Sequence, residues 1–99
     1  MIGGSITVNA YHLKDIADRV NEERRQAEEK KFYQWLMGEM EVVARNGKYK
    51  YEYEFNRNSL GFDIDVIVKM LQKEEYRTYI YFEDYSGLEI LKIEWSDLQ

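Results

Sequence analysis

The sequence predicts an α+β domain: a long N-terminal helix, continuous or broken, followed by strand, helix, strand and strand. Three observations lead to this class. Residues 9–46 carry apolar side chains at helical spacing. Residues 48–55, KYKYEYEF, alternate apolar and charged side chains, as a strand with one covered face does. Two further alternating segments lie near the C-terminus, so we expect a small three-stranded sheet, antiparallel or mixed, packed on the helices.

Length and composition fit a single domain over residues 1–99. The chain has 44% apolar and 15% aromatic residues, enough to bury a core. It has no cysteine, which excludes disulfides and thiolate metal sites. No apolar run approaches the roughly 20 residues that span a membrane, and the N-terminus MIGGSITV lacks the pattern of a signal peptide. We therefore expect a cytoplasmic protein with no membrane contact.

The net charge of −5 argues against duplex nucleic acid as a partner. Residues 1–47 carry seven basic and eight acidic side chains, and residues 48–99 carry seven and eleven, so neither half is basic. An acidic surface suits a basic protein partner, and it equally serves solubility.

The helical segment, residues 9–46, contains two apolar stripes that do not share a face. Asn9 is the expected N-cap, and Gly47 ends the helix. The first stripe is Leu13, Ile16, Ala17 and Val20, and the second is Phe32, Leu36, Met40 and Val43. At about 100° per residue, the stripes point roughly 150° apart. Either the helix breaks within residues 21–29, or the two stripes serve two different partners. The second stripe is the one expected to pack on the sheet.

The other elements follow from alternation and capping. Residues 1–8 are expected to be a flexible N-terminus in which Ile6 and Val8 add an edge strand or pack loosely. Residues 48–95 are expected to form the sheet and one helix. That helix runs from the N-cap Asp63 to about Glu75. Strands are expected at 77–83 and 88–95, paired as an antiparallel hairpin.

Several short motifs resemble small uncharacterised proteins of tailed bacteriophages and prophages. The helix ends in Ala44-Arg-Asn-Gly47, the short helix runs into Tyr76, and the last strand closes on Ile93-Glu-Trp95. The resemblance covers most of residues 10–95. It departs from the pattern at Glu75, where a glycine commonly precedes the tyrosine. It implies a phage or prophage origin and carries no active site to transfer.

Titratable residues show no catalytic or metal-binding arrangement. His12 is the only histidine, and it lies at a helix start among polar residues, so we expect a capping or solvent-exposed role. The Asp63/Asp65 pair sits where acidic side chains favour a helix start. The pairs Glu74/Glu75 and Glu83/Asp84 show no converging ligand set. We expect no cofactor, no metal and no enzymatic activity.

The nine tyrosines are the unusual feature of the composition. Those of the first strand are expected to cover the helices. If Ile80 and Phe82 face the core, Tyr79 and Tyr81 face away from it. The candidate ligand- or partner-binding residues are therefore Tyr79, Tyr81, Tyr85, Arg77 and Lys92. They fit a nucleotide, through stacking and phosphate contacts, or a subunit interface, or they simply fill a second sheet face.

These observations favour a non-enzymatic phage accessory protein in the host bacterial cytosol. We expect it to bind a host or defence macromolecule as an inhibitor or adaptor, which needs surface area and complementarity rather than catalytic groups. We also expect a homo-oligomer, with Leu13, Ile16 and Val20 at the contact. Two alternatives remain open: a protein that sequesters a nucleotide, and a virion or assembly component.

Overall fold

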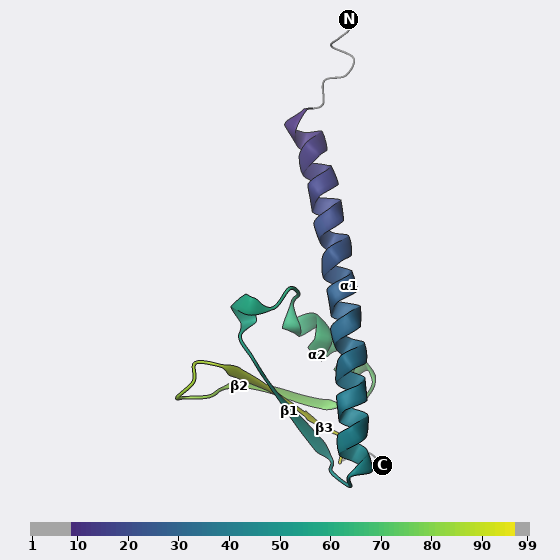
Figure 1. Cartoon of the computed structure of the whole chain (residues 1–99), viewed down its shortest axis with the longest axis vertical. Coiled ribbons are helices and arrows are strands. Elements are labelled where there is room, and N and C mark those ends of the chain that lie inside the picture. Colours follow the sequence, from purple (N-terminus) through teal and green to yellow (C-terminus); the bar gives the residue numbers. More distant parts are fainter. Residues whose placement is uncertain (1–8, 97–99) are drawn as a thin grey trace, which may run out of the picture.

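The structure, a computed structural model, describes residues 9–96 and confirms the α+β class (Figure 1). The expectations for Ile6 and Val8 lie outside the described residues. The elements in chain order are α1 (Ala10–Arg45), β1 (Lys50–Phe55), the 3-10 turn η2 (Arg57–Ser59), α2 (Ile64–Lys73), β2 (Arg77–Phe82) and β3 (Glu89–Glu94).

α1 is one uninterrupted helix of 36 residues, so the helix does not break within residues 21–29. The Asn9 side chain accepts a hydrogen bond from the His12 backbone N–H at 2.9 Å, which is the expected N-cap. Gly47 ends the helix with φ at +81°, a conformation that glycine adopts without steric cost. The polar middle stays helical because its charges pair along the helix, as Arg25 does with Glu22 and Glu29.

The three strands form an antiparallel sheet in the order β1-β3-β2, with β3 in the centre. The expected β2–β3 hairpin is confirmed, and Ile80 pairs with Leu91. On the other side of β3, Leu91 pairs with Tyr53. Leu91 therefore lies at the middle of one sheet face, and it is fully buried.

Both helices cover the Leu91 face of the sheet. The core combines apolar side chains of α1, α2, β1 and β3: Leu36, Met40, Phe55, Ile64, Ile67, Leu71, Leu91 and Ile93. An aromatic cluster extends it, because the Phe32 ring lies 5.1 Å from the Tyr53 ring and 4.9 Å from the Phe62 ring. The second apolar stripe of α1 therefore packs on the sheet, as its position in the sequence predicts.

Phe82 departs from its expected core position. It lies on the covered side of the sheet, in register with Glu89 and Phe55, yet it is 70% exposed. The reason is length: the β2–β3 hairpin extends beyond the helices that cover the rest of the sheet (Figure 1).

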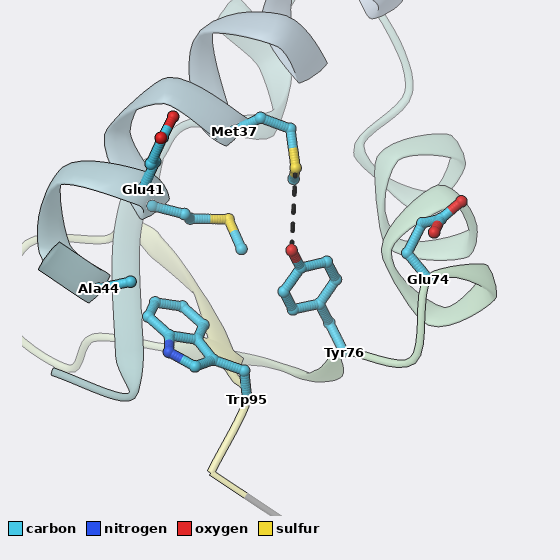
Figure 2. A pocket seen from close by; sticks show the side chains of 7 residues that line it. Met37, Glu41, Ala44, Glu74, Tyr76 and Trp95 are labelled. Atoms are coloured by element: carbon cyan, nitrogen blue, oxygen red, sulfur yellow. Dashed lines mark hydrogen bonds between the residues drawn. The ribbon is translucent and has the colours of Figure 1, made fainter. Parts of the chain in front are cut away.

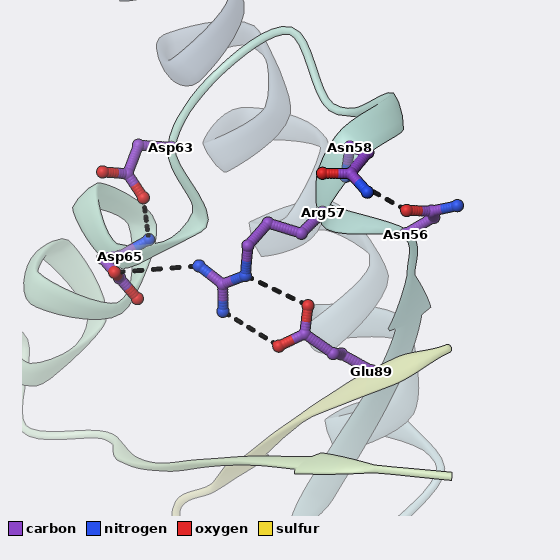
Figure 3. Close-up of polar contacts among 6 residues, drawn as sticks. All are labelled: Asn56, Arg57, Asn58, Asp63, Asp65 and Glu89. Carbon is purple, nitrogen blue, oxygen red and sulfur yellow. Dashed lines mark hydrogen bonds and ion pairs between the residues drawn. The ribbon is translucent and has the colours of Figure 1, made fainter. Parts of the chain in front are cut away.

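An ion pair links η2 to the first residue of β3 (Figure 3). The Arg57 guanidinium in η2 donates two hydrogen bonds of 3.0 Å to the Glu89 carboxylate, which is 8% exposed. Asp65 lies 3.7 Å from the same guanidinium. Asp63 accepts from the Asp65 backbone N–H at 2.9 Å, so the expected N-cap role of Asp63 is confirmed.

The described part of the molecule is elongated. The 36 residues of α1 alone span about 54 Å at 1.5 Å per residue, whereas a compact chain of this length has a radius of gyration of about 13 Å. The N-terminal half of α1 causes the difference, because it projects beyond the body formed by the sheet, α2 and the C-terminal half of α1 (Figure 1).

Candidate binding surfaces

The projecting half of α1 carries the first apolar stripe without cover. Every residue from Ala10 to Asn21 is exposed. Leu13 is 57% exposed, Ile16 42% and Val20 38%. Single exposed apolar residues are common on protein surfaces, whereas a stripe of them on one helix face is a candidate interaction surface.

This stripe faces away from the body. Leu36 and Met40, which enter the core, lie about 140° and 180° around the helix from Leu13. The loop at Gly61 approaches α1 about two turns beyond the stripe: a Cβ placed on Gly61 would lie 3.9 Å from the Glu28 side chain, which is about 120° and 80° around the helix from Ile16 and Val20. A partner can therefore lie along Leu13, Ile16 and Val20 without meeting the sheet or α2.

The open face of the sheet brings together four of the five predicted site residues. Tyr79 and Tyr81 are 46% and 42% exposed. The Lys92 ammonium lies 6.0 Å from the centre of the Tyr79 ring. Arg77 is on the same face because it lies two residues before Tyr79 and four before Tyr81 in β2. Tyr85 is fully exposed in the turn after β2, outside the strands.

Charges on this open face balance each other. Its basic residues are Lys50, Arg77 and Lys92, and its acidic residues are Glu52, Glu54 and Glu94. Lys92 lies 3.0 Å from Glu94, and this hydrogen bond raises the pKa of the lysine. Tyr81 donates a 2.8 Å hydrogen bond to Glu52 across β3, which raises the pKa of the tyrosine. A phosphate would have to compete with these carboxylates for Lys92 and Tyr81.

A third surface, which the sequence did not predict, is a pocket at the lower end of α1 (Figure 2). We call it the basal pocket. Its volume is about 370 Å³, and its lining residues come from α1 and from the ends of α2 and β3: Met37, Met40, Glu41, Ala44, Glu74, Tyr76 and Trp95. Pockets of this size hold small ligands or single side chains.

Aromatic rings form part of the basal pocket. The Trp95 indole N–H donates to the Lys48 carbonyl at 3.1 Å, which fixes the ring. Tyr76 meets Trp95 edge to face, with ring centres 6.3 Å apart. Its hydroxyl points at the Met37 sulfur, 4.0 Å away. Ala44, Tyr76 and Trp95, which belong to the short motifs singled out in the sequence, all line this pocket, and that coincidence is the signal that could have revealed it.

Comparison with protein families, curated proteins and solved structures finds no match to this chain. No helix in residues 9–96 is long and apolar enough to cross a bilayer. Within the same residues, no three histidine or acidic side chains gather where they could hold a metal ion. The three surfaces are therefore the features from which a function can be inferred.

Proposed function

We propose that the protein is a non-enzymatic binding protein that associates with a second copy of itself through the projecting half of α1. The observation that carries the proposal is the uncovered stripe of Leu13, Ile16 and Val20 on a helix that leaves the body. A chain of this size gains stability from burying such a stripe against a partner, since its own body does not reach it.

The spacing of the residues in the stripe suits a contact between two copies related by a two-fold axis. Its residues are spaced so that an antiparallel second copy, centred between Ile16 and Ala17, places Leu13 opposite Val20 of the other helix. Ile16 then faces Ala17. The paired length, from Asn9 to Arg24, is roughly 24 Å, and it ends before the helix reaches its core contacts at Phe32.

Charge supports the same arrangement. Residues 10–31 contain six basic and six acidic side chains, so this half of α1 is neutral, and the net charge of −5 belongs to residues 32–99. A parallel pair would place two acidic bodies side by side, which costs repulsion. An antiparallel pair places them at opposite ends and also opposes the helix dipoles.

Light scattering after size-exclusion chromatography tests this proposal. We expect a mass of twice 12.0 kDa for the native chain and 12.0 kDa for Leu13→Asp/Val20→Asp. Tyr11→Asp is the matched control, because Tyr11 is an 81% exposed apolar residue in the same helical turn but on the opposite face from Leu13. A native chain that stays monomeric at every concentration contradicts the proposal.

The body is proposed to contact the partner macromolecule. The open sheet face, with Tyr79 and Tyr81 beside Lys92, offers rigid aromatic side chains of the kind enriched at protein interfaces. The resemblance to phage proteins makes a host or defence protein the proposed partner. By occupying a site on this partner, the chain acts as an inhibitor or as an adaptor.

Affinity purification from bacterial cells, followed by mass spectrometry, tests the partner proposal. A host protein should be recovered with the native chain and lost with Tyr79→Ala/Tyr81→Ala. The matched control is Tyr49→Ala, which removes a tyrosine that is 63% exposed outside the strands. Recovery of the chain alone would overturn the proposal.

A further inference from the structure

The basal pocket is separate from the α1 stripe and from the open sheet face, so its role is independent of the proposed function. The last turns of α1 give it apolar walls, with Met37, Met40 and Ala44. Tyr76 and Trp95 supply its aromatic rings (Figure 2). Because Trp95 is held by the Lys48 carbonyl and by the edge contact with Tyr76, this wall is formed before any ligand binds.

Carboxylates flank the pocket from two sides. Glu41 projects from α1, and Glu74 lies across the pocket just after α2 (Figure 2). Glu41 pairs with Arg45 at 2.7 Å, in an exposed pair that contributes little. Glu74 makes no ion pair with any residue in the described part of the chain.

Two helix C-termini lie near Glu74, each with one basic residue in its last turn, Arg45 in α1 and Lys73 in α2. Both α1 and α2 end at this pocket, so the negative ends of two helix dipoles face it. Tyr33, one turn above Met37, has a raised pKa, first because of its burial and second because of the charge of Glu74. The helix ends and the two carboxylates disfavour an anionic ligand. The Glu74 carboxylate is exposed to solvent, so a cationic group of a ligand can reach it.

The combination of apolar walls, aromatic rings and a carboxylate at the mouth matches one kind of side chain. An arginine has an apolar stem, a guanidinium that stacks on aromatic rings, and a planar set of donors for a carboxylate. We propose that the basal pocket binds an arginine side chain from a basic segment of a partner protein, with the stem against Met37 and Met40 and the guanidinium between Trp95 and Glu74.

The chain offers a local probe for this binding. It has two tryptophans, Trp35 and Trp95, so a Trp35→Phe variant reports on Trp95 alone. The probe ligand is the peptide acetyl-Gly-Arg-Gly-amide, and its matched control carries citrulline in place of arginine, which keeps shape and removes charge. The readout is the Trp95 indole N–H resonance in a ¹H–¹⁵N spectrum, followed during titration at constant salt.

We expect the arginine peptide to shift the Trp95 resonance in a saturable way, and the citrulline peptide to bind at least about tenfold more weakly. Glu74→Gln should weaken arginine binding by a similar factor. Glu75→Gln, which removes the neighbouring carboxylate outside the pocket lining, should leave it unchanged.

Three outcomes would overturn the inference. The first is an unchanged Trp95 resonance up to millimolar arginine peptide. The second is equal binding of the citrulline peptide, and the third is an equal effect of Glu74→Gln and Glu75→Gln. Thermal unfolding of both variants checks that each retains the fold, because neither residue is buried.

Discussion

The Glu89 carboxylate is the one charged side chain among the buried residues of the described chain, and a single arginine compensates it. Arg57 reaches it with two hydrogen bonds from η2, thirty-two residues earlier in the sequence. No local pattern in the sequence indicates this pair, because alternation places Glu89 on the covered face of β3 without identifying its partner. A buried carboxylate without a cation would be costly, so Arg57 fixes η2 to the end of the sheet.

Removing Arg57 should therefore destabilise the fold. We expect Arg57→Ala to lower the free energy of unfolding by about 1–3 kcal/mol, because Glu89 loses both donors while staying largely buried. Urea unfolding monitored by circular dichroism measures it. Arg57→Ala/Glu89→Gln should recover part of the loss, since the amide is neutral. Equal stability of the native chain and Arg57→Ala would show that the pair is not structural.

Tyrosine ionisation should destabilise the protein at alkaline pH. Burial, and then the charge of Glu39, raise the pKa of Tyr51 above its ordinary value near 10. Below that value the phenol is protonated in both states and its contribution to stability is complete. As pH rises through the folded-state pKa, the unfolded chain loses its proton more readily, so stability falls.

The corresponding measurement compares unfolding of the native chain and Tyr51→Phe at about pH 8 and at about pH 10.5. Because phenylalanine cannot ionise, the variant should lose less stability between the two values than the native chain does. The same alkaline loss in both proteins would show that Tyr51 does not contribute to it.

At the scale of elements, the sequence predicted most of the fold because each segment carries a local signal. Alternation located all three strands, and Asn9, Asp63 and Gly47 marked helix ends that the structure confirms. Continuity of α1 was left open, because stripe geometry is compatible with a break or with an uncovered face. The basal pocket was missed since Glu74 and Trp95 belong to different elements, and only the tertiary fold brings them together.

Gly38 should be a weak point in α1. It lies inside the helix, and a Cβ placed on it meets nothing within 4 Å. Gly38→Ala should therefore raise the free energy of unfolding by about 0.5–1 kcal/mol, by reducing the freedom of the unfolded backbone. Thermal unfolding measures the change, and a lower unfolding temperature for Gly38→Ala would refute it.

Glu75 should be strained at the end of α2. Its φ is +72°, in the left-handed region where side chains other than glycine carry a steric cost. Glu75→Gly should stabilise the protein by roughly 1 kcal/mol, and Gly47→Ala, with φ at +81°, should do the reverse. Chemical denaturation measures both changes, and destabilisation by Glu75→Gly would show that the residue is not strained.

At the scale of the whole molecule, the boundary between the projecting helix and the body is also a boundary in net charge. Residues 10–31 are neutral and include the projecting stripe, whereas residues 32–99 carry the charge of −5 and the core. The division of charge supports antiparallel pairing of two copies through Leu13, Ile16 and Val20.

Cysteine cross-linking tests that pairing most directly, because the native chain contains no cysteine. A mixture of the Leu13→Cys chain and the Val20→Cys chain, each with its own tag, is oxidised mildly and the disulfide products are separated by mass. Antiparallel pairing predicts that the mixed product dominates and that Tyr11→Cys gives none with either chain. Equal yields of mixed and unmixed products, or no disulfide at all, would contradict antiparallel pairing.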